Sequence, residues 1–181
     1  MLAVTTQSLP LGETAPSFGD LKSADGRRYS LSDFDSSSVL ALVFISNGCP
    51  TVRVYNERLV NLQAEYAARG VQLVAINSNN PHLSPIDSYS EMAARSEDSG
   101  YNFPYLKDED GSVAHSYGAI ATPHAFVFDR ERKLRYRGRI DDSRDPANVT
   151  TRELRDAIAA LVDEHEVEVP ETQPFGCAIV R

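Results

Sequence analysis

The hydrophobic pattern of this chain changes period several times, and its clearest stretch predicts a strand–helix–strand unit. Residues 39–45 are apolar without interruption and rich in β-branched side chains, which is typical of a strand buried on both faces of a sheet. Five apolar residues then recur at helical spacing: Val52, Tyr55, Leu59, Leu62 and Tyr66. Gly70 is expected to end this helix, and the apolar run Val71–Asn77 follows as the next strand. Such a unit requires parallel strands joined by a right-handed crossover.

Two β-hairpins are expected, one on each side of this unit. Residues 17–21 and 28–31 flank the dipeptide Asp25–Gly26, which suits a tight turn. Residues 125–128 and 134–137 are predicted to pair across a short polar connection.

Two further helices complete the predicted order. Ser84 and Pro85 are expected to cap and begin a helix that ends before Gly100. A capping box at residues 150–153 is expected to open the last helix. Its inward side chains are Leu154, Ile158 and Leu161. A short strand and a helical turn are expected between these helices, at residues 103–106 and 113–117.

This order of elements predicts a layered α/β domain. The domain is expected to span residues 1–163, and a chain of this length can bury a substantial core. The tail, residues 164–181, is expected to be irregular and to pack on that domain or extend from it.

Composition and charge exclude several classes of function. The formal net charge of −8 argues against a nucleic-acid partner. Residues 1–12 lack the basic start and apolar run of a secretory signal, and no apolar run is long enough to cross a bilayer. Two cysteines cannot supply the disulfide framework of a small secreted domain, so a cytoplasmic location is expected. No two of the four histidines have i, i+4 spacing, and neither a metal nor another cofactor is expected.

Cys49 is the first candidate for chemistry because it lies between a buried strand and the helix that follows. Functional groups in such sheets gather beyond the carboxyl ends of the strands. A thiol at a helix N-terminus faces unpaired backbone N–H groups and the positive end of the helix dipole, and both favour the thiolate. Pro50 is expected to be the first helical residue, and Arg53 could add a positive charge one turn further on. We therefore expect Cys49 to have a lowered pKa and to be a nucleophile.

Several segments resemble a known superfamily. Phe44–Val52, with the strand and helix beside it, looks like the active-site turn of the thioredoxin superfamily. Residues 12–18, followed by Asp25–Gly26 and by residues 30–34, resemble the start of its redoxin branch, that of the alkyl hydroperoxide reductases and thiol-specific antioxidant proteins. Residues 122–129 are similar to the segment that carries the superfamily's cis-proline. The tail 170–177 looks like that of a peroxiredoxin-like subgroup.

The resemblance implies a fold and a set of roles. The fold would be thioredoxin-like, with a central mixed sheet flanked by helices, an N-terminal β-hairpin and a helical insertion. Cys49 would be the nucleophile, tuned by Pro50 and the helix dipole. Thr122 and Pro123, joined by a cis peptide bond, would lie against Cys49 and position the partner, offering backbone groups that pair with a substrate strand.

The chain also departs from the patterns of these relatives. Val52 stands where a thioredoxin has its second cysteine, which excludes the local dithiol cycle. Leu42 and Pro123 occupy positions where peroxiredoxins have a proline and an arginine, and Ser46 is a mild substitute for their threonine. Arg53 could take the place of the missing arginine.

These observations predict a thiol-dependent oxidoreductase in which Cys49 takes part in disulfide exchange or hydroperoxide reduction. The expected partners are a protein or small-molecule disulfide, a hydroperoxide and a thiol reductant, with no nucleic acid and no membrane. Cys177 could resolve an oxidised Cys49, pair with another chain, or have no role. The alternative, from a different class, is a redox-inactive binding module with a degenerate site.

Overall fold

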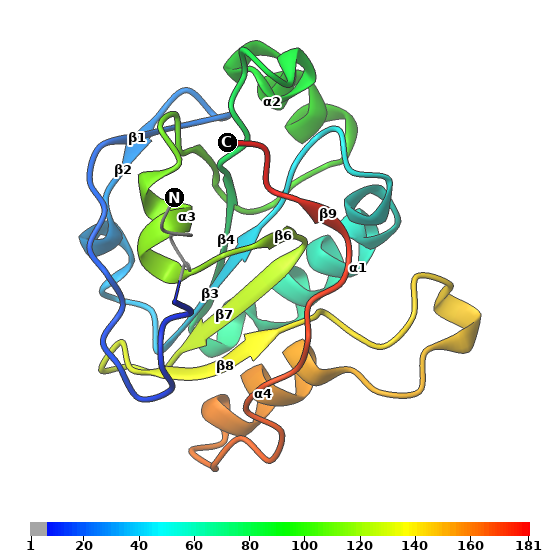
Figure 1. Ribbon diagram of the computed structural model, residues 1–181. Coiled ribbons are helices and arrows are strands. Elements are labelled where there is room, and N and C mark those ends of the chain that lie inside the picture. The colour runs from blue at the N-terminus through cyan, green and yellow to red at the C-terminus, as the bar shows by residue number, and fades with distance from the viewer. Residues whose placement is uncertain (1–6) are drawn as a thin grey trace.

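A mixed sheet forms the centre of the structure (Figure 1). The computed structural model describes residues 7–181, and within these residues seven strands pair in the order β2-β1-β5-β4-β3-β7-β8. They are β1 (Leu21–Ser23), β2 (Arg28–Tyr29), β3 (Val39–Phe44), β4 (Val71–Asn77), β5 (Tyr105–Lys107), β7 (His124–Phe128) and β8 (Leu134–Gly138). The pairs β3–β4 and β4–β5 are parallel, and the other pairs are antiparallel. Two short strands, β6 (Ala121–Thr122) and β9 (Cys177–Ala178), form a separate antiparallel pair.

Strand β3 is buried on both faces, as its unbroken apolar run predicts. Val39, Ala41 and Val43 belong to the hydrophobic cluster on one face of the sheet. Leu40 and Phe44 belong to the cluster on the other face. Because side chains alternate along a strand, a strand between two cores needs apolar residues at every position.

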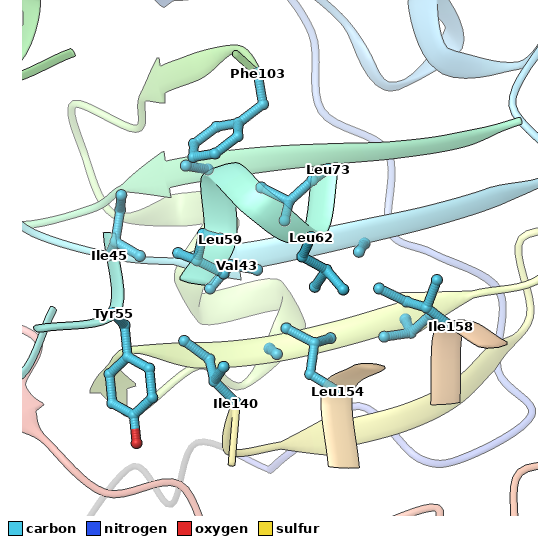
Figure 2. Packing of buried hydrophobic residues seen from close by; sticks show 14 of the residues in the cluster. Val43, Ile45, Tyr55, Leu59, Leu62, Leu73, Phe103, Ile140, Leu154 and Ile158 are labelled. Carbon is cyan, nitrogen blue, oxygen red and sulfur yellow. The ribbon is translucent and has the colours of Figure 1, made fainter. Parts of the chain in front are cut away.

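Helices cover both faces of the sheet. Helices α1 (Pro50–Tyr66), α2 (Tyr89–Asp98) and α4 (Glu153–Val162) contribute to one core, and α3 (Ser112–Tyr117) contributes to the other. Figure 2 shows Leu59 and Leu62 of α1 in front of the strands, with Leu154 of α4 below Leu62. Burying one such side chain contributes about 1.5–3 kcal/mol. Among residues 7–181, no helix is long and apolar enough to cross a membrane.

Helix α1 begins at the residue that the sequence predicts, and the helical segment that it opens stops at Gly70 as predicted. Cys49 is its N-cap and Pro50 its first residue, where the missing N–H of proline costs nothing. A short 3-10 helix, η2 (Ala67–Arg69), extends it, and Gly70 ends the segment with a φ of +80°. The five apolar residues of the predicted stripe are all buried.

Several predicted boundaries were wrong. The first hairpin strand begins at Leu21, because Asp20 has a φ of +56° that interrupts the extended backbone. The short strand begins after Pro104, which has no N–H to donate to a neighbouring strand. Ser84 and Pro85 open only a 3-10 turn, η3 (Pro85–Asp87), and α2 begins after an extended Ser88.

The last helix lacks the predicted capping box. Its N-cap is Arg152, which makes no side-chain cap, and the Thr150 hydroxyl donates to the Asp142 carboxylate instead. Leu154 and Ile158 face the core as predicted, while Leu161 is half-buried.

The tail is mostly irregular, but it returns across the sheet and adds strand β9 to β6 (Figure 1). It therefore packs on the domain.

Candidate active site

Cys49 lies just beyond the end of β3, at the first turn of α1. Its backbone is extended (φ −79°, ψ 115°), as expected of an N-cap residue, and only 2% of its surface is exposed. The flanking Gly48 and Pro50 are exposed, so the thiol is covered by other parts of the chain.

The main partner of the Cys49 thiol is the Thr122 backbone. The Cys49 Sγ–H donates to the Thr122 carbonyl oxygen over 3.1 Å. The Thr122 and Ser46 hydroxyls are 3.0 Å apart and form a hydrogen bond, which joins the loop before Cys49 to this strand. The Thr122–Pro123 peptide bond is cis, as expected, and Thr122 is buried. Ser46, Cys49 and Thr122 therefore form one cluster.

The tail brings Cys177 to the same cluster. In the β6–β9 ladder Cys177 is the direct partner of Thr122. The approach is close because residue 176 is glycine, whose φ is +155°; a Cβ atom there would lie 2.1 Å from the Thr122 carbonyl oxygen. Cys49 and Cys177 thus both lie at the Thr122 backbone, and Cys177 packs against the hydrophobic cluster that contains Cys49.

The surroundings of the two thiols shift their pKa values in opposite directions. Burial alone would raise the pKa of Cys49. Three hydrogen-bond donors oppose burial and lower this pKa below its ordinary value: the Cys177 thiol, the Val52 backbone N–H and the Thr122 hydroxyl. Burial raises the pKa of Cys177 to about 11, and the hydrogen bond to Cys49 adds to the effect. Cys177 therefore keeps its proton and can donate it to a Cys49 thiolate. The lowered pKa agrees with the expectation from the helix N-terminus.

A buried carboxylate holds the loop before Cys49. Asp87 is fully buried, and its Oδ1 accepts hydrogen bonds from the backbone N–H of Asn47 (2.6 Å) and the side chain of Asn77 (2.8 Å). Its Oδ2 accepts from the side chains of Asn79 (2.9 Å) and Ser84 (2.6 Å). Burial would raise the pKa of Asp87, but these bonds lower it. This network explains why α2 starts late: the Asp87 side chain turns inward at the position where the helix was predicted to begin.

A second set of contacts holds the tail beside α1. Phe175 packs against Tyr55, with ring centroids 6.3 Å apart. The Tyr55 hydroxyl donates to the buried Asp141 over 2.7 Å, and Arg58 forms an ion pair with the same carboxylate over 2.7 Å. Residues of α1 therefore fix the tail on one side of Cys49.

Arg53, which the sequence offered as a positive charge near Cys49, does not bind the Cys49 thiol, and neither does His124, which follows Pro123. Arg53 is exposed and makes a long hydrogen bond of 3.4 Å to the Asn47 carbonyl. The His124 ring packs against Phe126 in a tilted arrangement, with ring centroids 4.5 Å apart, and Phe126 belongs to the core on the α3 side of the sheet. Burial, together with the charge of Arg137, lowers the pKa of His124 to about 4. Within residues 7–181, no three His, Cys, Asp or Glu side chains come together as a metal site requires.

Sequence reasoning missed Asp87 and its partner Asn47. Asp87 follows Ser84 and Pro85 in what looks like an ordinary first helical turn, where a carboxylate suits the helix dipole. The pattern gave no sign that this side chain points inward. The pairing of Cys177 with Thr122 was also beyond local pattern, although Gly176 beside a cysteine was a hint of close backbone approach.

Comparisons with known proteins match this chain to redoxin and thiol-disulfide oxidoreductase proteins. A family model described as Redoxin matches residues 10–158. The crystal structure of the hypothetical protein SMc02350 from Sinorhizobium meliloti 1021 is 39% identical, with a TM-score of 0.88, and the match covers 96% of this chain and 95% of that one. An uncharacterized conserved protein from Geobacillus kaustophilus is 40% identical, with a TM-score of 0.87 and coverage of 95% and 92%. The thiol-disulfide oxidoreductase ResA of Bacillus subtilis (strain 168) is 28% identical over 128 residues, which are 71% of this chain and 66% of that protein. Structural neighbours include a thioredoxin domain, and the predicted thioredoxin-like fold is confirmed.

Proposed function

This chain belongs to the redoxin family of the thioredoxin superfamily, and from that premise we propose that it is a thiol oxidoreductase in which Cys49 is the nucleophile and Cys177 is the resolving thiol. The observation that carries the proposal is that both cysteines meet at Thr122: the Cys49 thiol donates to its carbonyl oxygen, and Cys177 is its partner in the β6–β9 ladder. A redox-inactive binding module would have no need for two thiols with opposite pKa shifts at one point.

The first step uses the thiolate of Cys49. Attack on a disulfide forms a mixed disulfide and releases the second sulfur as a thiol after it takes a proton. Attack on a hydroperoxide breaks the O–O bond, gives Cys49 sulfenic acid and releases an alcohol or water. The Val52 N–H and the Thr122 hydroxyl stabilise the thiolate before the attack.

The second step uses Cys177. Its sulfur attacks the oxidised Cys49 and forms the Cys49–Cys177 disulfide, with a thiol or water as the leaving group. The Thr51 backbone N–H favours the Cys177 thiolate, so the same helix terminus supports both sulfur atoms. An external thiol then reduces the disulfide and restores the pair. The similarity to ResA, which is named as a thiol-disulfide oxidoreductase, supports thiol–disulfide exchange as the general class of reaction.

The test is to oxidise the reduced protein with one equivalent of hydrogen peroxide or of a small disulfide and to map the cysteines by mass spectrometry. We expect a monomer that has lost two hydrogen atoms and contains a Cys49–Cys177 disulfide. Cys177→Ser should stop at the sulfenic acid or mixed disulfide of Cys49, and Cys49→Ser should not react. If Cys177 stays reduced while wild-type Cys49 is oxidised, or pairs only between chains, the two-thiol cycle is wrong.

A further inference from the structure

The C-terminal strap, defined here as residues 170–181, is held on both sides of Cys177. On one side Glu171 forms an ion pair with Arg137 over 2.8 Å, and the Thr172 N–H donates to the Arg137 carbonyl over 3.0 Å. On the other side the Val180 N–H donates to the Asn79 side chain over 2.9 Å. The strap is therefore a segment fixed at two ends, and Cys177 lies between the fixed points.

The strap occupies the backbone edge that an extended polypeptide would need. Cys177 pairs with Thr122 in the β6–β9 ladder, and Gly176 lies directly against the Thr122 carbonyl. A peptide strand can reach Cys49 along β6 only by taking the place of β9, because one strand edge pairs with one partner. Thr122 and Cys49 are each only 2% exposed. A polypeptide disulfide must therefore displace the strap before its sulfur atoms meet Cys49.

We propose that the strap determines substrate specificity: it excludes polypeptide disulfides from Cys49 and admits small oxidants such as hydroperoxides. This inference rests on the proposed function. A hydroperoxide needs room for two oxygen atoms beside the sulfur, whereas a folded or extended polypeptide needs the β6 edge. After the small oxidant converts the Cys49 thiolate to a sulfenic acid, the Cys177 thiol attacks that sulfur, an S–S bond forms, and the hydroxyl leaves with the thiol proton as water. The strap then supplies the resolving sulfur from the position in which it excludes larger substrates.

Substitution of Gly176 is the most direct way to weaken the docking of the strap. An alanine Cβ would lie 2.1 Å from the Thr122 carbonyl oxygen, so Gly176→Ala should lift the strap without changing either cysteine. Gly100→Ala is the matched control, because Gly100 also has a positive φ (+63°) but a Cβ there meets no atom within 4 Å. Phe175→Ala is a second, milder variant that removes the contact with Tyr55.

The experiment measures the rate constant for loss of the Cys49 thiol with hydrogen peroxide and with insulin, a disulfide-bonded polypeptide, by rapid quenching and mass spectrometry. Hydrogen–deuterium exchange of residues 175–180 reports how firmly the strap is docked. We expect Gly176→Ala to speed exchange and to raise the ratio of the insulin rate to the peroxide rate at least tenfold. Phe175→Ala should raise the exchange rate and the rate ratio by less than Gly176→Ala does. Gly100→Ala should match the wild type in both measurements.

The possible outcomes distinguish a failure of the specificity proposal from a failure of the proposed function. If peroxide gives the Cys49–Cys177 disulfide but the rate ratio stays constant while exchange speeds up, the proposed function stands and the strap does not determine specificity. Unchanged exchange in both strap variants would overturn the proposal as well, since the strap would not be held by the contacts named. If Cys49 reacts with neither reagent in any variant, the proposed function fails and the specificity proposal fails with it.

Discussion

Replacing Asp87 by asparagine should destabilise the protein much more than its small change in shape suggests. The carboxylate accepts four hydrogen bonds, two on each oxygen. The amide of asparagine has one oxygen, and its NH₂ group must face two former donors. The Ser84 hydroxyl can rotate and accept, but the other donor at that end loses its partner.

The size of the effect follows from that count. One hydrogen bond to a charged group contributes about 1.5–3 kcal/mol, and an unpaired buried donor costs about 1–3 kcal/mol. We expect Asp87→Asn to lower the free energy of unfolding by about 3 kcal/mol. With a dependence of this free energy on urea of about 2 kcal/mol per molar, the urea midpoint should fall by about 1.5 M. Equilibrium urea unfolding at neutral pH measures this. Asp98→Asn, which changes an exposed carboxylate, is the control and should shift the midpoint little.

The pH dependence identifies the charge as the cause. Because its hydrogen bonds lower the pKa of Asp87 in the folded protein, the charged form stabilises the fold above the unfolded pKa of about 3.9. That contribution is lost as the pH falls below about 4 and through the folded pKa. The difference between wild type and Asp87→Asn should therefore shrink in acid. A loss below about 1 kcal/mol at neutral pH, or a difference that does not change with pH, would refute this account of the loop.

Two other predictions concern the cysteines and His124. Cys177→Ala removes a hydrogen-bond donor that lowers the pKa of Cys49, so the pH profile of Cys49 alkylation should move to higher pH; identical profiles for wild type and variant would contradict this effect of Cys177. The pKa of His124 is lowered to about 4 by burial and by the charge of Arg137, so the unfolded chain binds a proton that the folded one does not between that value and about 6.5. The free energy of unfolding should fall over this range as the pH drops, and His124→Gln should remove this part of the pH dependence in urea titrations.

The long elements could be predicted from sequence because one local force dominates each of them. Strand β3 has apolar residues at every position, and α1 combines a helical stripe with Pro50 at its start and Gly70 after its end. Pattern, propensity and termination agree there, and the structure follows them.

The errors occur where a distant partner overrides the local signal. Thr150 has the residue spacing of a capping box, yet its hydroxyl binds Asp142. Asp87 suits a first helical turn, yet donors from two strand ends draw it inward. In both cases a side-chain hydrogen bond to a partner outside the helical turn itself decides the backbone, and the pattern of the turn does not show that partner.

The candidate site likewise has one cysteine that local sequence features reveal and one that they do not. Cys49 could be found from its place after a buried strand, because strand and helix are local features. The position of Cys177 depends on where an irregular tail returns, which the hydrophobic pattern does not encode. What the sequence offered was Gly176, and the structure shows why that residue has no side chain.

In the proposed cycle, the absence of a second cysteine at position 52 makes the reaction depend on the docking of the tail. With Val52 in the usual place of a resolving thiol, the effective concentration of Cys177 at Cys49 depends on how much of the time the strap is bound. A contact such as that of Phe175 with Tyr55 therefore acts on the reaction without touching the sulfur atoms. In that proposed cycle, an oxidised Cys49 meets Cys177 before other reagents when the strap is docked. When it is released, the sulfenic acid is open to external thiols and to further, irreversible oxidation. Formation of the disulfide in turn holds the strap in place, because each event stabilises the other by the same free energy.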